Sequence, residues 1–372
     1  MNPLRSPLHD EHVALGATLV DFAGWEMPVR YSGDIAEHVA VRTSAGLFDL
    51  SHMGEIAVRG TDAVAFLEFA LIGRMGAMAL GKAKYTMICA PDGGVIDDLV
   101  VYRRDWDHFV IVANASNKDI VFAELNRRAG LFAVTLHDES AAVALIAVQG
   151  PASPGIVRAM IDRDAENLDT LPYYAATNVV LDGDIHAFVA RTGYTGEDGF
   201  ELFVGADEAV AVWRLALAIG GSALTPCGLS SRDTLRLEAG MPLYGQELTR
   251  DTTPFDAGLG RVIAFGTETN PRGDFVGRAA LEAARDAGPT RVLVGLVGDG
   301  RRSPRTGYAV VAADGTRLGE VTSGAPSPTL GRPIGMAYVE ASASEPGTEV
   351  LIDVRGRGEP MTVAALPLYR RA

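Results

Sequence analysis

The chain has 372 residues, of which 48% are hydrophobic and 22% are charged, a balance typical of a folded globular protein and unlike that of a disordered chain. Its formal net charge of −14 argues against sequence-independent binding to nucleic acid, which requires a basic surface. The length predicts about two or three domains. An anionic ligand would need a local cluster of arginines or lysines.

The sequence also lacks the common motifs of metal binding and the apolar segments of secretion or membrane insertion. The two cysteines, Cys89 and Cys227, lie far apart and outside any CxxC or CxxH spacing, and no HExxH motif is present. The N-terminal segment 1–12 carries charges and has no apolar stretch of the secretory type. The longest near-apolar stretch, 141–148, is far shorter than the roughly 20 residues of a membrane span. We therefore expect a cytoplasmic protein with no metal, no membrane partner and no nucleic-acid partner.

Hydrophobic periodicity and turn residues predict a mixture of helices and strands up to about residue 285. The expected helices span 34–44, 61–72, 117–129, 206–219, 231–239 and 274–285, and a further helix opens at Pro151. The expected strands span 56–59, 83–89, 95–103, 108–113, 143–148, 178–181, 185–191 and 200–204. Asp34 and Glu37 have the spacing of a capping box at the first of these helices, and Gly46 would end that helix.

After Gly288-Pro289 the pattern changes to short β-like runs separated by turns, which predicts a small antiparallel barrel or sandwich. The preceding part lacks a regular alternation of strand and helix. The predicted fold class is therefore α+β.

Two adjacent carboxylates, Asp97 and Asp98, follow the turn 91–94 and enter an apolar strand. Strand alternation points their side chains to opposite faces, so at least one of them could face the interior. A buried carboxylate is costly unless it is paired or binds a ligand. The alternative is that both carboxylates lie on the solvated rim of the turn, and the sequence leaves both interpretations open.

The segment 191–202, RTGYTGEDGFEL, places three glycines in a hairpin-like turn. Tyr194 and Glu201 flank this turn. Glycine permits unusual backbone angles or the close approach of a planar ligand. A carboxylate can accept two N–H bonds from an aminopyrimidine edge, and an aromatic ring can stack on a heterocycle. The segment does not fit the GxGxxG nucleotide fingerprint. The alternative is a plain β-turn with solvated acids.

Arg232 lies in the first turn of the helix expected at 231–239, where a cation is unfavourable against the helix dipole. This position indicates an external partner for Arg232, either a side-chain carboxylate or a ligand. The alternative is a weak salt bridge to Asp233 or Glu238. Among the seven histidines, only His52 lies inside a glycine- and acid-rich motif, and we expect it to be a satisfied structural histidine.

Taken together, the segments resemble the aminomethyltransferase, or T-protein, family of the glycine cleavage system. The resemblance runs essentially from end to end and rests on an ordered set of motifs: DFAGWEMP at 21–28, VRTSAGLFDLSHMG at 41–54, GGVIDDLVVY at 93–102, RTGYTGEDGFEL at 191–202, CGLSSRDTLRLEAGMPLYGQEL at 227–248 and TSGAPSPTLG at 322–331. Two positions depart from the family pattern, since Arg261 stands where many relatives have Trp and Ser230 replaces a usual Gly.

The resemblance implies a three-lobed fold with tetrahydrofolate in a central channel and a C-terminal antiparallel β-barrel. The expected domains are 1–54 with 136–240, 55–135 with 241–285, and 290–372. The implied reaction transfers the methylene carbon of an aminomethyl group from lipoylated H-protein to tetrahydrofolate. Its products are 5,10-methylenetetrahydrofolate, ammonia and dihydrolipoyl H-protein.

The resemblance also implies roles for individual residues. Asp98 matches the catalytic aspartate, and the folate-binding positions fall on Tyr85, Asn114, Tyr194, Glu201 and Arg232, and less directly on Tyr369 and Arg370. H-proteins of this family are themselves acidic, so a local basic patch is expected to dock the partner. We expect that patch to contain Arg301, Arg302, Arg305, Arg370 and Arg371.

Two alternative functions are considered beside this one. A folate-dependent demethylating module of the dimethylglycine or sarcosine type would usually accompany an FAD-binding region, and the chain has no Rossmann fingerprint. A non-catalytic folate-binding protein of the iron–sulfur-assembly type would carry a Lys-Gly-Cys-Tyr-type motif. The corresponding segment here, 241–246, reads MPLYGQ and has no cysteine. Both the segment and the Asp97-Asp98 pair favour the enzyme.

Overall fold

The computed structural model describes residues 3–354 and 356–371 and confirms the α+β class. The chain divides into two compact units: the first contains residues 1–67, 75–85 and 99–232, and the second contains residues 68–74, 86–98 and 233–372. The boundary falls inside strands β6 (Ala83–Cys89) and β7 (Val95–Arg103) and inside helix α8 (Leu229–Glu238). The three-domain division expected from the sequence stays a prediction.

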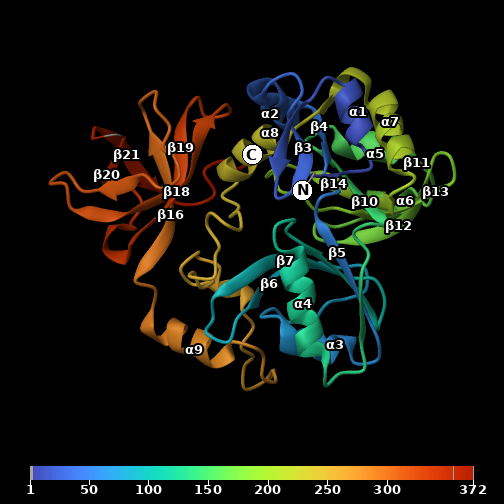
Figure 1. Cartoon of the computed structure of the whole chain (residues 1–372), viewed down its shortest axis with the longest axis horizontal. Coiled ribbons are helices and arrows are strands. Elements are labelled where there is room, and N and C mark those ends of the chain that lie inside the picture. The colour runs from blue at the N-terminus through green and yellow to red at the C-terminus, as the bar shows by residue number, and fades with distance from the viewer. Residues whose placement is uncertain (1–2, 355, 372) are drawn as a thin grey trace. The chain divides into compact units, whose positions relative to one another are not determined.

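The first unit is built on a seven-stranded sheet. Its strand order is β11 (Ile161–Arg163), β12 (Ala176–Leu181), β13 (Ile185–Ala190), β14 (Gly199–Gly205), β10 (Val143–Gln149), β4 (Ala45–Asp49) and β15 (Leu224–Pro226). Helices α5 (Ser153–Met160) and α7 (Ala209–Gly220) pack against this sheet, and the short helix α6 (Glu166–Asp169) contacts β12 (Figure 1). All the strands expected in this region are present, whereas β4, β11 and β15 were not predicted.

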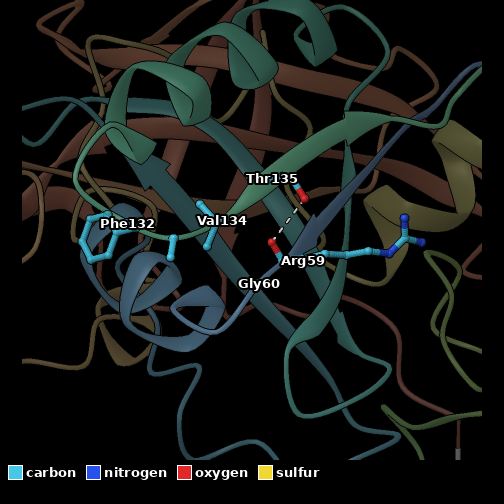
Figure 2. A pocket seen from close by; sticks show the side chains of 6 residues that line it. Arg59, Gly60, Phe132, Val134 and Thr135 are labelled. Carbon is cyan, nitrogen blue, oxygen red and sulfur yellow. Dashed lines mark hydrogen bonds between the residues drawn. The ribbon is translucent and has the colours of Figure 1, made fainter.

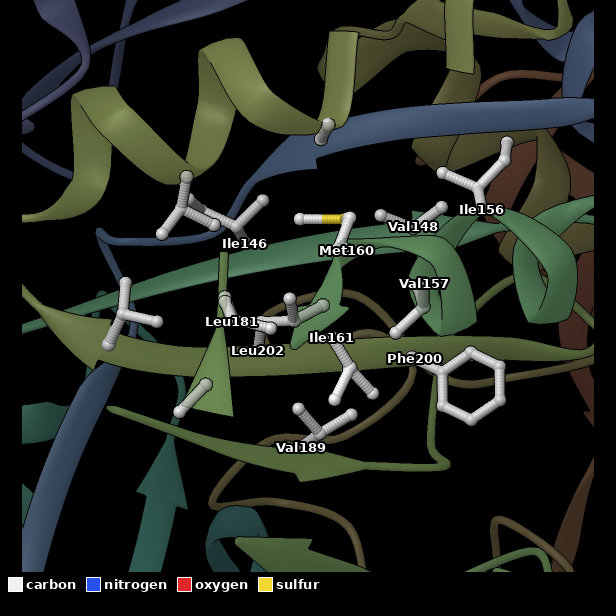
Figure 3. Packing of buried hydrophobic residues seen from close by; sticks show 14 of the residues in the cluster. Ile146, Val148, Ile156, Val157, Met160, Ile161, Leu181, Val189, Phe200 and Leu202 are labelled. Carbon is white, nitrogen blue, oxygen red and sulfur yellow. The ribbon is translucent and has the colours of Figure 1, made fainter. Parts of the chain in front are cut away.

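Alternation along β14 divides its side chains between a core face and a polar face. Phe200, Leu202 and Val204 belong to the buried cluster beneath α5 and α7, and Figure 3 shows Phe200 and Leu202 packed near Val157 and Ile161. The intervening residue Glu201 therefore lies on the other face of the sheet. The register pairs Glu201 with an alanine on each neighbouring strand, which leaves room around its side chain.

The N-terminal segments form a structure that periodicity did not predict. A three-stranded sheet has the order β1 (Leu4–Arg5), β3 (Trp25–Arg30) and β2 (Thr18–Phe22), and helix α1 (His9–Ala14) lies between β1 and β2 in the chain. Asp49, at the end of β4, accepts a hydrogen bond of 2.6 Å from Ser6, and its Oδ2 lies 2.8 Å from Nε2 of the buried His12. These contacts anchor the N-terminal segment to the seven-stranded sheet.

Helix α2 (Asp34–Thr43) begins and ends differently from the expected capping pattern. Its N-cap residue is Gly33, so Asp34 is already inside the helix. Glu37 uses one carboxylate oxygen to accept the backbone N–H groups of Tyr31, Ser32 and Gly33, and the other to accept that of Gly228. Gly46 does not end the helix but lies in β4, where an added Cβ would overlap the side chain of Val41.

A five-stranded sheet has the order β6, β7, β8 (His108–Ala113), β5 (Gly54–Arg59) and β9 (Thr135–Asp138), with helices α3 (Ala63–Ala70) and α4 (Lys118–Ala129) in its connections. Helix α4 packs against β5 and β9. Within β7, alternation points the side chains of Asp98, Val100 and Tyr102 to one face and that of Asp97 to the other.

The second unit contains helix α9 (Arg278–Ala287) and a closed antiparallel barrel, drawn in orange and red in Figure 1. The barrel order is β16 (Arg291–Gly298), β19 (Arg332–Glu340), β18 (Arg317–Ser327), β17 (Ala309–Val311), β20 (Glu349–Asp353) and β21 (Gly358–Ala364). The barrel is therefore confirmed over the sandwich. Over residues 3–354 and 356–371, no helix combines the length and the apolar character that a bilayer crossing demands.

Candidate functional site

Glu201 is held on the polar face of β14 by two hydroxyl groups. The hydroxyl of Thr192 donates a short hydrogen bond to Glu201 Oε2, and the hydroxyl of Tyr102 donates another of 3.3 Å to the same oxygen. Burial, followed by the nearby charge of Glu201, raises the pKa of Tyr102 well above its ordinary value, so the phenol stays protonated and can donate. Glu201 is only partly buried. Its position is therefore fixed on one side while the carboxylate stays accessible.

Tyr102 and Thr192 were not predicted as site residues, although both lie inside motifs that the sequence displays. Tyr102 shares a strand face with Asp98, and its ring packs edge-on against Phe203 at a centroid distance of 5.4 Å. Phe203 lies on the same face of β14 as Glu201. Strand alternation gave the signal for Tyr102, but only the tertiary structure shows which residue it meets.

The glycines of the segment 191–202 allow its backbone to wrap around one buried side chain. A Cβ added at Gly193 or Gly199 would overlap the carboxamide of Gln149, which is fully buried. That carboxamide donates a hydrogen bond of 3.0 Å to the carbonyl of Thr192 and accepts one of 3.0 Å from the hydroxyl of Thr195. The expected close approach at these glycines is therefore made to Gln149.

Two acidic residues of this segment, Glu197 and Asp198, form ion pairs with arginines. Asp198 receives two hydrogen bonds, of 2.8 and 2.7 Å, from the guanidinium of Arg191. Glu197 is buried and forms an ion pair of 2.9 Å with Arg42, which also donates to the carbonyl of Thr195. The interpretation of the segment as a plain turn with solvated acids is therefore wrong for Glu197, whose carboxylate is fully covered.

Arg232 approaches the same site from helix α8. Its guanidinium carbon lies 4.9 Å from the centroid of the Tyr194 ring, a cation–π contact. Burial lowers the pKa of Arg232, and the charge of Glu201 and the phenol of Tyr194 act in the opposite direction. Three of the predicted residues, Tyr194, Glu201 and Arg232, are thus brought together in the first unit.

The alternative partners proposed for Arg232 are used elsewhere. Asp233 accepts a hydrogen bond of 2.8 Å from Arg236. Glu238 is fully buried and accepts hydrogen bonds from Ser327 and Thr329. The interpretation that Arg232 is absorbed in a local salt bridge is therefore not what the structure shows.

His52 lies close to this group and is buried, but it is not satisfied as expected. Its Nδ1 is buried without a hydrogen-bond partner among the described residues, and its ring meets Phe22 edge-on at 5.5 Å. Burial lowers its pKa to about 4, and the neighbouring charge of Arg232 acts in the same direction while that of Asp49 opposes it. The imidazole is therefore neutral at physiological pH.

Tyr173 and Tyr174 were also not predicted. Their rings meet edge-on at 4.9 Å, and Tyr174 has a left-handed φ of 57°, which is unusual for a bulky residue. Burial and the charges of Glu201 and Asp198 raise the pKa of Tyr173, which places its phenol within the field of those carboxylates. Tyr173 remains 56% exposed, so its ring could be reached from solvent. No local sequence pattern distinguishes this loop from an ordinary one.

The other predicted residues of the first unit lie on the five-stranded sheet. Tyr85 is a partly exposed residue of β6. Asn114 directly follows β8 and is also partly exposed, and its carbonyl accepts a hydrogen bond of 2.9 Å from the backbone of Asn117, which begins the turn into α4. Their role in binding stays a prediction.

The paired carboxylates differ in accessibility. Asp97 is fully buried, whereas Asp98 is partly exposed, so only Asp98 is open to a ligand. The alternative that both lie on a solvated rim is therefore wrong. Asp98 belongs to the second unit, together with Tyr369 and Arg370. The backbone of Tyr369 is fixed by a hydrogen bond of 2.8 Å from its N–H to the carbonyl of Glu238, and the next residue, Arg370, is exposed.

Two other features contribute nothing to this site. In the described parts of the chain, no group of three or more His, Cys, Asp or Glu residues is placed to hold a metal ion. A hollow of about 380 Å³ lies between the end of β5 and the start of β9, where it is lined by Gly60, Phe132 and Thr135 (Figure 2). It contains none of the predicted site residues, and Arg59 turns toward Glu139, 3.1 Å away.

Comparison with known proteins identifies the family of the chain. The sequence model of the GCVT N-terminal domain matches residues 8–267, and that of the glycine cleavage T-protein C-terminal barrel domain matches residues 291–370. The chain belongs to the glycine cleavage T-protein family. The resemblance found in its motifs is thereby confirmed.

Relatives of this T-protein family member match it over nearly their whole length. The aminomethyltransferase of Streptomyces coelicolor is 58% identical over 372 residues, covering 99% of this chain and 98% of that protein. That of Geobacillus kaustophilus is 44% identical and covers 99% of both. The crystal structure of glycine cleavage system aminomethyltransferase T from Bartonella henselae superposes with a TM-score of 0.88 at 35% identity, over 98% of each chain. The activity class of this family member is that of an aminomethyltransferase.

Proposed function

We propose that this chain transfers the methylene carbon of aminomethylated, lipoylated H-protein to tetrahydrofolate in the cytoplasm. The products are 5,10-methylenetetrahydrofolate, ammonia and dihydrolipoyl H-protein. The observation that carries the proposal is the carboxylate of Glu201, which two hydroxyls hold in place while it remains accessible beside Arg232 and Tyr194. The family membership gives this group its chemical meaning.

In this proposal the first unit recognises the pterin. A fixed carboxylate such as Glu201 can accept two N–H bonds from an aminopyrimidine edge, and charged acceptors make hydrogen bonds about twice as strong as neutral ones. Tyr194 offers an aromatic face, and the guanidinium carbon of Arg232 lies 4.9 Å from the centroid of that ring. Tyr85 and Asn114 complete the proposed folate-binding set, with Tyr369 and Arg370 from the C-terminal segment.

Asp98 is assigned to the chemical step. The donor is a thioaminal, S–CH2–NH3⁺, whose C–N and C–S bonds break while new bonds form from the carbon to N5 and N10 of the folate. The two N–H protons leave these nitrogens, one reaching the departing sulfur and the other the departing ammonia, which is released as ammonium, so charge and atoms balance. A carboxylate beside N5 and N10 can orient the folate, stabilise the developing positive charge and carry a proton. The partial exposure of Asp98 suits this role.

The docking patch for H-protein is proposed on the arginines of the second unit. Arg301, Arg302, Arg305, Arg370 and Arg371 are all exposed. Arg302 is partly neutralised by an ion pair of 2.7 Å with Glu359. Arg301 and Arg305 therefore contribute more than Arg302 to the proposed attraction to an acidic partner.

Replacing Asp98 by Asn tests the assignment while preserving the shape of the side chain. A positioned acid–base group contributes about 10²–10⁴-fold, so turnover with aminomethylated H-protein should fall by that factor while tetrahydrofolate affinity changes little. Asp92→Asn is the matched control, because Asp92 is exposed on the adjoining turn and its Oδ1 accepts the N–H of Gly94, as an amide oxygen also can. Wild-type turnover in Asp98→Asn would remove Asp98 from the mechanism.

Neither alternative function gains support from a specific observation. The relatives that match over nearly their whole length are named aminomethyltransferases, and the segment 241–246 lacks the cysteine of the folate-binding assembly proteins. Folate binding without formation of methylenetetrahydrofolate from aminomethylated H-protein would instead favour a binding module.

A further inference from the structure

A buried ion pair connects helix α8 to the segment that follows it. Nη1 of Arg236 donates a hydrogen bond of 2.8 Å to Oε2 of Glu247, and Nη2 donates one of 2.8 Å to the hydroxyl of Ser323 on β18. Ser323 in turn donates 2.6 Å to the other carboxylate oxygen of Glu247. Arg236 is 2% exposed and Glu247 is 0% exposed. Ser323 thus bridges the two side chains of the ion pair, and the charges of Arg236 and Glu247 compensate each other.

The carboxylate of Glu247 also shapes the backbone of residues 243–252, which we call the support segment. Oε2 of Glu247 accepts a hydrogen bond of 2.9 Å from the N–H of Leu243. The N–H of Glu247 donates another of 2.9 Å to the carbonyl of Leu243. The carbonyl of Glu247 accepts 2.7 Å from the hydroxyl of Tyr338 on β19. The buried carboxylate of Glu247 therefore holds the start of the support segment together with these backbone hydrogen bonds.

The support segment in turn holds the beginning of β7. The carbonyl of Thr252 accepts the N–H of Val95 at 3.0 Å, and the hydroxyl of Tyr244 donates to the carbonyl of Val95 at 3.3 Å. Gly94 lies so close that an added Cβ would overlap the carbonyl oxygen of Arg250. Both backbone groups of Val95 are thus taken by the support segment, three residues before Asp98.

We infer that the buried Arg236–Glu247 pair is a positioning device that sets the place of Asp98 through the support segment. This inference rests on the proposed function, because it requires that Asp98 act on the reacting folate. All of its contacts lie within the second unit. The proposed pterin contacts of Glu201, Tyr194 and Arg232 lie in the first unit. The proposed folate contacts in the second unit, Tyr369 and Arg370, lie outside the support segment, so a disturbance of that segment should alter turnover without altering folate affinity.

Two substitutions perturb the two ends of this chain of contacts. Glu247→Gln removes the charge and keeps the shape, and Gly94→Ala pushes the turn away from Arg250 while leaving the ion pair intact. The overlap forces a movement of about 1 Å, and misplacement of that size costs about 10²-fold in rate. We expect kcat to fall about 100-fold in Gly94→Ala and about 10-fold in Glu247→Gln, with the Kd for tetrahydrofolate within about threefold of wild type.

The double variant distinguishes positioning from general stabilisation. If both changes act through the same support segment, the double variant should be no slower than Gly94→Ala alone, because coupled sites are not additive. The control is Arg128→Met, which breaks the 2.7 Å ion pair between the buried Arg128 and the partly exposed Glu124, both on α4. This control should lower the melting temperature and leave kcat unchanged.

The possible outcomes distinguish a failure of the positioning role of Glu247 from a failure of the proposed role of Asp98. A Glu247→Gln enzyme that melts earlier but turns over at the wild-type rate would overturn the positioning role and leave the role of Asp98 standing. Independent, multiplicative losses in the double variant would overturn it as well. If Asp98→Asn itself turns over normally, the proposed role of Asp98 and this inference fall together.

Discussion

Neutralising Glu201 is the sharpest test of the binding site. Glu201→Gln keeps the side-chain volume and still offers an oxygen to Thr192 and Tyr102, so the supporting hydrogen bonds survive. Only the negative charge beside Arg232 is lost, and one acceptor oxygen becomes a donor. The substitution therefore isolates the electrostatic part of ligand recognition from the packing of β14.

The expected magnitude follows from the strength of the hydrogen bonds. A hydrogen bond to a charged group contributes about 1.5–3 kcal/mol net, against about 0.5–1.5 kcal/mol for a neutral one. The bond to the remaining oxygen weakens by about 1–1.5 kcal/mol, and the bond at the new amino group, about 1.5–3 kcal/mol, is lost, so the total is about 2.5–4.5 kcal/mol. At about 1.4 kcal/mol per factor of ten, Kd for tetrahydrofolate should rise about 60- to 1,600-fold.

Isothermal titration calorimetry with tetrahydrofolate measures this change directly. Glu139→Gln is the matched control, because Glu139 belongs to the same unit but pairs with Arg59 beside the hollow that contains no site residue. The control should bind as wild type does. A Kd for Glu201→Gln within about threefold of wild type, with an unchanged melting temperature, would refute the assignment of this carboxylate to the pterin.

Two further predictions concern pH and partner docking. Because burial lowers the pKa of His52 to about 4, the unfolded chain binds the extra proton first as pH falls from about 6.5, so the folded state loses stability through that window. Chemical denaturation should show a loss of about 2 kcal/mol between pH 7 and pH 5 that is largely absent in His52→Leu. For docking, the double reversal Arg301→Glu with Arg305→Glu should raise KM for H-protein with little change in kcat, whereas Arg317→Glu on β18 should not. An unchanged KM would remove Arg301 and Arg305 from the docking surface.

The sequence predicted the parts of the fold whose residues repeat in a regular pattern. The strands that include Val143, Ile185 and Phe200 were recognised because they are apolar runs bounded by turns, and the structure places them in one sheet. The C-terminal barrel was recognised from short strands at regular intervals. The contact of Glu201 with Tyr102 on β7 could not be predicted in the same way, because the two residues are 99 positions apart in the chain.

The errors have specific physical causes. The N-terminal sheet was missed because β1 and β2 are short and largely exposed, and Pro28 interrupts the pattern of β3. Asp34 was taken for a cap because its spacing to Glu37 is correct, but Glu37 instead gathers backbone N–H groups that precede the helix. Tyr102 was overlooked because an aromatic residue in an apolar strand looks like core, and its hydroxyl meets Thr192 and Glu201, which come from distant parts of the chain.

The loop 191–202 settles its conformation before any ligand arrives. Gln149 fills the space left by its glycines, Arg42 neutralises Glu197, and Arg191 neutralises Asp198, so the ordering entropy of the loop is spent during folding. A ligand that meets Tyr194 and Glu201 therefore meets a preorganised surface and retains more of its contact energy as affinity. Such a loop acts as a rigid template, and its specificity can be altered at Tyr194 without rebuilding the turn that carries it.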